Sequence, residues 1–512
     1  MVSDAKLQVA RWQLSGPAFN SYSESTDYLS VDYTINVDTR FADGPVLGPL
    51  RNDISLSGAG GTPTTVSVIE SSKDANASGH KFVYFARGDR LCKVRPSSWN
   101  VENATTTAEA ITDIRYTKNA AGTKEISAMM AGSVMEVVTT CADGGGTDTT
   151  TVVSTTTARV GNYGFPKDRI FLGNGQAINQ VVLSGSVTMA APVVTTITTV
   201  ADAVTFTSIE RDGDDMIFGT NRGPFFLDTV LNQYRAIVPG MDADNDNCRG
   251  MKEWPYLGII IPLAYGARYY RQGAGRSIDS GNVNFPRNTS PVMGGWSAFD
   301  FNSNTSWAYC VVYNSVTTDS YLCAVTTSKP NILPLDYYPI AKFTATQCKA
   351  LKFIGTELLT TNPTLVGGYG TDAFYMTLGR LQREIDDTNY RYEASGTLYG
   401  TEWRVPEGYE ADVEFIEFET ASCATGKTIA ASISFDGQTA VTYGAAVNSS
   451  SYPNARVRLY PPSQQKGSRI KPQWDYATDA STTSPQIKNG VAYLGYKLRP
   501  KAIDGRTLEG LR

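Results

Sequence analysis

Apolar and polar residues alternate in short runs along most of the chain, and the runs come in pairs around turns that contain Gly or Asn. Four clear pairs are FVYFARGDRLCKV (82–94), ISAMMAGSVMEVV (126–138), RIFLGNGQAINQV (169–181) and MIFGTNRGPFFLD (216–228). Three looser pairs follow at 257–270, 307–325 and 364–378. Alternation with period two around such turns is typical of β-hairpins. Helical periodicity is nearly absent, so the pattern predicts an all-β protein.

The spacing of these pairs indicates a repeat. They begin roughly 40 to 60 residues apart, which is the repeat length of four-stranded propeller blades. A single blade cannot bury both of its faces, so blades stack around an axis and close into a ring. Seven copies predict a β-propeller of six to eight blades, with seven as the expected number, over residues 59–382. Ordinary sandwiches or barrels are the alternative, because any β-rich chain contains hairpins at irregular spacing.

The pattern changes after residue 383. ADVEFIEFE (411–419) alternates with one slip at Phe415-Ile416, which is the signature of a β-bulge. Asp436-Gly437 then joins two alternating runs, as expected for a hairpin with a type I′ turn. Residues 383–512 therefore predict a second all-β domain, a β-sandwich or jelly roll. Residues 1–58 hold one clear strand pattern, YLSVDYTINV (28–37), and predict an N-terminal arm that docks on neighbouring subunits.

Composition excludes several classes of protein. A chain of 512 residues is too long for one ordinary core, which fits two or more domains. The net charge is −5 and no run of Lys and Arg offers a phosphate-binding footprint, so we expect no nucleic-acid partner. The N-terminus lacks the apolar core of a signal peptide, and the longest apolar run, 257–264, contains a proline and is too short to span a bilayer. We expect cytoplasmic synthesis and no membrane insertion.

The seven cysteines do not form a disulfide framework. The closest pair, Cys310 and Cys323, flanks a predicted hairpin and could lie across two strands. Because the expected site of synthesis is reducing, we predict that both are reduced and buried.

Several segments resemble the propeller-plus-sandwich virion proteins of tailed bacteriophages. They are RIFLGNGQAI, MIFGTNRGPFFLDTV, CRGMKEWPYLGIIIP, LVGGYGTDAFYMTLGR and TTSPQIKNGVAYLGYKLRP. In those proteins blade motifs lead into a jelly-roll-like domain whose last strand follows a Ser-Pro pair, as Ser484-Pro485 does here. The resemblance covers residues 160–500. It implies a structural protein of the tail, tail tip, tail fibre or capsid surface, located in the virion, present in several copies and bound to other virion proteins.

Catalytic chemistry is limited by the presence of a single histidine, His80, in the polar loop SGHKF. A Ser-His-Asp or Cys-His triad would have to use it, and multi-histidine metal sites are excluded. Glu414 and Glu417 would share a face only if a bulge separated them, and a solvated polar face is then the expected result. We therefore expect no enzyme. A propeller glycan hydrolase is the competing hypothesis.

One acidic segment matches a calcium loop. Asp242, Asp244 and Asp246 occupy positions 1, 3 and 5 of DADNDNCRGMKE, and Glu253 occupies position 12. Alternate oxygens in a tight loop can point inward at a hard cation, so these four residues are candidate calcium ligands. The alternative is a solvated loop stabilised by Asx turns, because no helices flank the segment.

An aromatic and basic cluster follows in AYGARYYR. Tyr265, Arg268, Tyr269, Tyr270 and Arg271 are residue types enriched at protein interfaces, and tyrosines can also stack on sugar rings. We predict a subunit contact here. Contact with a host surface glycan and simple packing within a blade are the alternatives.

Overall fold

The computed structural model is all-β in the residues that it describes, with the 3₁₀ helix η3 (Glu384–Asp386) as its one named helix. This confirms the predicted fold class at that level. The description omits the ends 1–5 and 502–512 and the segments 19–21, 27–28, 57–63, 73–77, 119–123, 131–133, 140–148, 165–167, 201–203, 239–240, 256, 265, 272–276, 280–282, 285–292, 304, 327–334, 356–362, 380–383 and 449–455. No helix in the described part is both long and apolar enough to cross a membrane.

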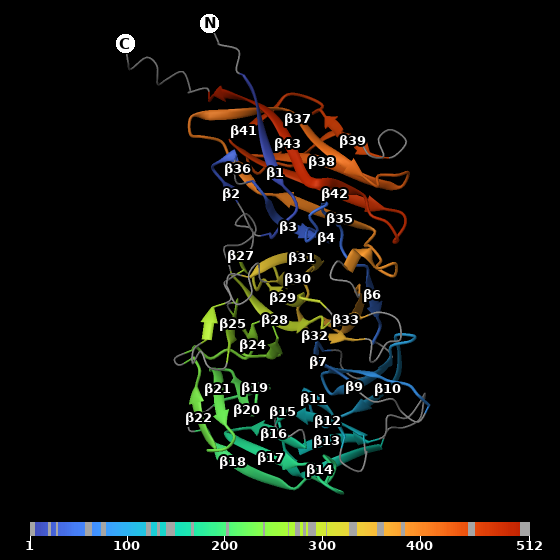
Figure 1. Cartoon of the computed structure of the whole chain (residues 1–512), viewed down its shortest axis with the longest axis vertical. Coiled ribbons are helices and arrows are strands. Elements are labelled where there is room, and N and C mark those ends of the chain that lie inside the picture. Colours follow the sequence, from blue (N-terminus) through green and yellow to red (C-terminus); the bar gives the residue numbers. More distant parts are fainter. Residues whose placement is uncertain are drawn as a thin grey trace, which may run out of the picture.

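Seven antiparallel sheets follow one another along the middle of the chain (Figure 1), and within each the strands pair mainly in chain order. The first four are β7 (Val66–Ser71), β8 (Val83–Arg87), β9 (Arg90–Arg95) and β10 (Asn100–Thr106); β11 (Ile111–Lys118), β12 (Lys124–Met130), β13 (Val134–Thr139) and β14 (Thr149–Thr157); β15 (Val160–Tyr163), β16 (Arg169–Asn174), β17 (Ala177–Val182) and β18 (Val194–Thr199); and β19 (Phe206–Asp212), β20 (Asp215–Thr220), β21 (Gly223–Asp228) and β22 (Gln233–Ala236).

The last three sheets continue this order, but the seventh takes its fourth strand from the amino-terminal region. They are β23 (Lys252–Trp254), β24 (Gly258–Leu263), β25 (Gly266–Tyr270) and β26 (Ser277–Asp279); β27 (Val283–Asn284), β28 (Met293–Phe301), β29 (Ala308–Tyr313), β30 (Ser320–Thr326) and β31 (Asp336–Phe343); and β32 (Cys348–Ile354), β33 (Thr364–Tyr369), β34 (Asp372–Thr377) and β6 (Arg51–Ile54).

Hydrophobic clusters lie between consecutive sheets. Each of seven clusters takes its side chains from two sheets that are neighbours in this order. The seventh cluster joins Val366 and Ala373 of the last sheet to Val83 and Phe85 of the first. We call β7, β11, β15, β19, β23, β28 and β32, one from each sheet, the inner strands. Each contacts the next in this order, and β32 contacts β7 again.

Two further sheets share one large core, at the top of Figure 1. One contains β1 (Leu7–Gln13), β43 (Gln486–Pro500), β37 (Tyr409–Ala421) and β40 (Arg456–Leu459), with β41 (Gln465–Gly467) paired to β37. The other contains β2 (Tyr22–Ser23), β36 (Glu402–Arg404), β42 (Arg469–Thr478), β35 (Ser395–Gly400), β3 (Val31–Ile35), β38 (Lys427–Phe435) and β39 (Val441–Val447). Strict alternation along β42 buries Ile470, Trp474 and Tyr476 in this core.

Two local predictions in this region can be compared with the structure. Asp436 and Gly437 have φ angles of 51° and 79°, and the two residues form the predicted turn between β38 and β39. Strand β37 is bulged, but between Val413 and Phe415 rather than at Phe415-Ile416. Glu414 and Glu417 are both held in ion pairs there, with Lys497 and Arg458.

The amino-terminal strands pair inside the chain. β1 adds to β43, β3 adds to β35 and β6 adds to β34. The described strands of residues 1–58, a segment predicted to be an arm that docks on neighbouring subunits, thus pair with strands of their own chain. The reason is burial, because Trp12 of β1 is 1% exposed and its indole N–H donates to the carbonyl of Thr401 at 3.1 Å.

A buried charge network lies beside β4 (Val37–Asp38), which pairs with β5 (Val46–Leu47). Arg40 binds Asp38 at 2.7 Å and Glu384 at 3.0 Å, and all three side chains are 0% exposed. The hydroxyl of Tyr309, on β29, donates to Glu384 at 2.5 Å. The network therefore ties the amino-terminal segment and η3 to the sixth of the seven sheets.

The cysteine prediction can be tested for six of the seven residues. All six described cysteines are unbonded and buried. Cys310 and Cys323 face each other directly across β29 and β30, as predicted. Cys141 lies outside the described residues.

Candidate functional site

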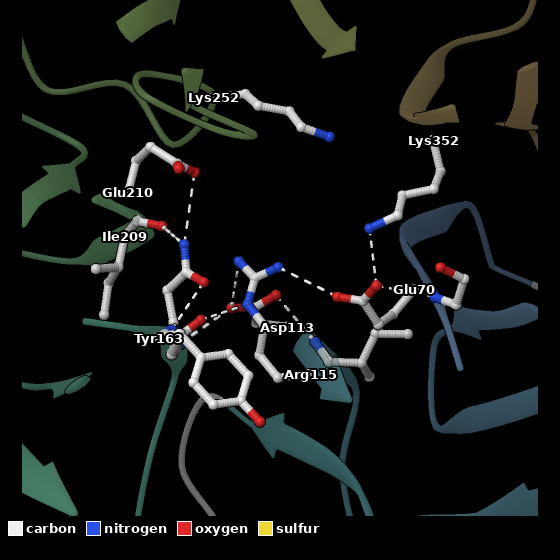
Figure 2. A network of polar contacts seen from close by, with 12 residues as sticks. Glu70, Asp113, Arg115, Tyr163, Ile209, Glu210, Lys252 and Lys352 are labelled. Atoms are coloured by element: carbon white, nitrogen blue, oxygen red, sulfur yellow. Dashed lines mark hydrogen bonds and ion pairs between the residues drawn. The ribbon is translucent and has the colours of Figure 1, made fainter. Parts of the chain in front are cut away.

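The inner strands of the seven sheets surround a cavity of about 520 Å³. Each contributes one polar side chain at an equivalent position, 42 to 52 residues from the next along the chain. We call this set the central ring: Glu70, Arg115, Asn162, Glu210, Lys252, Asp300 and Lys352. Six of its members line the cavity, and Asp300 binds Lys252 beside it. Figure 2 shows Glu70, Arg115, Glu210, Lys252 and Lys352 directed into the same space.

A second set of equivalent residues lies three positions earlier along the chain, on the inner strand or, for Arg159 and Arg249, just before it. We call it the bulge ring: Ser67, Thr112, Arg159, Thr207, Arg249, Ser297 and Lys349. Five of these positions fall where the inner strand slips register against its partner, which is a β-bulge. Three residues of strand separate the two rings by about 10 Å.

Hydrogen bonds from the bulge ring link one sheet to the next. The hydroxyl of Thr112 donates to the carbonyl of Arg159 at 2.6 Å, and that of Thr207 to the carbonyl of Asn247 at 2.8 Å. Ser67 and Ser297 donate in the same way, to Ile111 and Cys348. The bulge turns these side chains along the ring and so supports contacts that a regular strand would not make.

Ion pairs in the central ring also cross between sheets (Figure 2). Lys352 of the seventh sheet lies 2.7 Å from Glu70 of the first, whose other oxygen lies 3.6 Å from Arg115 of the second. Lys252 of the fifth sheet lies 2.5 Å from Asp300 of the sixth. These groups are therefore occupied in holding the sheets together.

Carboxylates also accept backbone hydrogen bonds from the following sheet. Asp113 lies 3.4 Å from Arg115 and accepts the N–H of Gly161 at 3.0 Å. Asp300 accepts the N–H of Phe353 at 2.7 Å. Such charge-assisted bonds are stronger than bonds between neutral groups.

The pKa values of the two glutamates of the central ring are shifted in opposite directions. Burial alone would raise the pKa of Glu70, but Lys352 and Arg115 outweigh burial and lower this pKa to about 2. Burial raises the pKa of Glu210 to about 7, against a smaller opposing effect of Arg115 and Lys252. The amide of Asn162 lies 3.5 Å from its carboxylate. Glu210 is thus a group that can change charge near neutral pH.

The predicted calcium ligands do not come together. Asp244 accepts the backbone N–H of Asp246 at 2.8 Å, which is an Asx turn. Asp246 faces two cations, Arg249 at 3.5 Å and Lys349 at 3.7 Å. Asp242 is exposed and Glu253 lies on β23. In the part of the chain that is described, no three His, Cys, Asp or Glu side chains are grouped so as to hold a metal ion. Asp246 is therefore engaged by two cations, and calcium binding by this loop stays a prediction.

The predicted aromatic interface is largely internal. Tyr269 and Tyr270 are 6% and 3% exposed, and they pack into the two clusters on opposite sides of the fifth sheet. Arg268 is partly buried on β25, Arg271 is exposed, and Tyr265 lies outside the described residues. Packing against the neighbouring sheets accounts for both described tyrosines. His80 is partly buried near Arg95, at 3.5 Å.

Sequence reasoning missed both rings. The signal was present, because a small or basic polar residue is followed three positions later by a charged or amide residue in SVIE, TDIR, RVGN, TSIE, RGMK, SAFD and KALK. The repeats that stand out in the sequence are the hairpins of the second and third strands, because their turns contain Gly or Asn. The inner strands have no such turn and look like ordinary half-buried strands.

No family model matches the sequence, and a search of curated proteins finds no relative.

Proposed function

We propose that the chain is a non-catalytic structural protein made of a seven-bladed β-propeller and a jelly-roll-like β-sandwich. The propeller would comprise residues 59–382 together with β6, and the sandwich residues 383–512 together with β1 to β3. The proposal rests on the order of the seven sheets, the hydrophobic clusters between neighbours, and the contact of β32 with β7. In a propeller a strand from the other terminus commonly completes the last blade, which is the role of β6.

The observation that carries the non-catalytic role is the ion pairing of the central ring. Both carboxylate oxygens of Glu70 face cations, and Asp300 is bound by Lys252 and by a backbone N–H. A nucleophile or general base needs an accessible lone pair. The charged groups of the central ring are already ion-paired with neighbouring sheets, so they stabilise the ring instead.

We further propose that the chain is a subunit of a tailed-bacteriophage virion, in the tail or its tip, present in several copies and bound to other virion proteins. The support is the resemblance of the segments between residues 160 and 500, together with the two all-β regions tied by a buried charge network. Rigid β-rich subunits of this kind suit a symmetric assembly. A virion protein that binds a receptor or host glycan is the competing binding role.

The test is quantitative mass spectrometry of purified virus particles from the source culture. We expect stoichiometric recovery, at a copy number set by the symmetry of the particle. Absence of the chain from particles would overturn the virion proposal.

A glycan hydrolase is a second candidate, and one observation favours it. The split pKa values of Glu70 and Glu210 place an ionised and a protonatable carboxyl group in the same cavity, as acid and base roles require. Incubation with host surface polysaccharide separates the two roles. Release of sugar by the wild type but not by Glu210→Gln would replace the structural proposal with the enzyme.

A further inference from the structure

The bulge ring presents donors and positive charge to the cavity. Its members are two serines, two threonines, two arginines and one lysine, and none is a carboxylate. The four hydroxyl groups donate to backbone carbonyls of the following sheet. Of the three cations, Arg159 and Arg249 precede the first strands of the third and fifth sheets, and Lys349 lies on β32 of the seventh.

Positive charge exceeds negative charge at this end. Arg249 and Lys349 both line the cavity, and both have Asp246 as their ion-pair partner within the described chain, at 3.5 and 3.7 Å. The side chains of Arg249 and Lys349 remain 25% and 24% exposed, so solvent reaches them. Two cations therefore share one distant carboxylate, which is itself 35% exposed.

Arg159 is a further cation near Arg249, outside the lining of the cavity. Its Nε donates to the carbonyl of Phe206 at 3.0 Å. Burial and then the neighbouring Arg249 lower the pKa of Arg159, and no carboxylate offsets either effect. Arg159 thus lies near enough to Arg249 to feel its charge, while Arg249 itself is paired with Asp246.

The acids of the central ring cannot cancel this charge. Glu70 and Asp300 are bound by Lys352 and Lys252, and they lie about 10 Å further along the strands. Asp113, which follows Thr112 of the bulge ring, is bound by Arg115 and by the N–H of Gly161. An anion at the bulge ring would meet cations without displacing these pairs.

We propose that the bulge-ring end of the cavity binds a multivalent oxyanion of the phosphate or sulfate class, contacted by Arg249 and Lys349. Guanidinium groups match the geometry of such anions, and lysine adds a point charge. The cavity, at about 520 Å³, lies within the size range of small-molecule sites. The anion is either free or a group on a larger molecule. This proposal is independent of the virion assignment.

The test is isothermal titration of the full-length protein with inorganic phosphate, in a buffer without other multivalent anions. We expect one saturable site with a dissociation constant in the millimolar range. The double variant Arg249→Gln/Lys349→Gln should bind at least about tenfold more weakly, because two charge-assisted contacts are lost. The matched control is Lys466→Gln/Lys488→Gln, which removes two exposed cations from the sandwich and should bind as the wild type does.

Two outcomes would overturn the proposal: no saturable heat with the wild type, or equal weakening in the control. A charge-preserving variant, Arg249→Lys/Lys349→Arg, checks that loss of binding is not loss of fold, and it should keep measurable binding. Titration with a phosphate monoester then separates the two sources. Equal affinity for phosphate and ester assigns a free anion, and tighter binding of the ester assigns a group on a larger molecule.

Discussion

Replacing Arg40 with methionine removes the only cation of the buried Arg40–Asp38–Glu384 network while keeping most of the side-chain volume. Nε and Nη2 of Arg40 make three contacts of 2.7 to 3.0 Å with the two oxygens of Asp38 and one of 3.0 Å with Glu384. Asp38 and Glu384 would then stay buried, with 0% exposed side chains and no counter-ion in the network. Leaving a buried charge unpaired costs about 3–5 kcal/mol, so we expect a loss of that size in the free energy of unfolding.

The assay is urea unfolding followed by tryptophan fluorescence. Trp307 is a local reporter, because the Arg40 guanidinium lies 4.9 Å from its ring centre. The control is Lys488→Met, which breaks an exposed pair with Glu419 and should cost less than about 1 kcal/mol. The triple variant Arg40→Met/Asp38→Asn/Glu384→Gln removes the stranded charges and should recover much of the loss. The reasoning is refuted if Arg40→Met shifts the midpoint no more than Lys488→Met, or if the triple variant recovers nothing.

Two further perturbations test the amino-terminal pairing and the charged cavity. Trp12→Ala should cost about 3–5 kcal/mol in the unfolding transition, because the buried indole and its bond to Thr401 are lost; a loss below about 1 kcal/mol would contradict the docking of β1. Because the pKa of Glu210 rises from 4.5 to about 7 on folding, the folded state binds the proton more tightly, and stability should fall as pH rises between these values. Melting temperatures from pH 5 to pH 8 should show this slope in the wild type and a smaller one in Glu210→Gln, and equal slopes would refute the assignment.

The features predicted well from the sequence are local. The hairpins of 82–94, 169–181 and 216–228 appear as β8–β9, β16–β17 and β20–β21. In the first two, glycines at the turns adopt positive φ angles, 59° at Gly88 and 55° at Gly175. A hairpin is specified by alternation and by its own turn, so neighbouring residues carry the whole signal.

The features that were missed depend on residues far apart in the chain. Strand β6 reads as the polar run RNDI, and only its pairing with β34 makes it a strand. The acidic loop matches a calcium motif by spacing. Its Asp246, however, forms an ion pair with Lys349, which lies about a hundred residues away in the sequence. The charge of a site is set by all the elements packed against it, and a local motif contains only one of them.

The placement of β1 has a consequence for biosynthesis. Strand β1 (Leu7–Gln13) leaves the ribosome about 480 residues before its partner β43 (Gln486–Pro500). At ~5–20 residues per second, about 24 to 96 s separate the two. During that interval the nascent β1 must remain unpaired, and β6 must likewise wait for β34. We therefore expect each region to close only after its late strand has been made, and translation products that stop before β34 or β43 would expose open sheet edges.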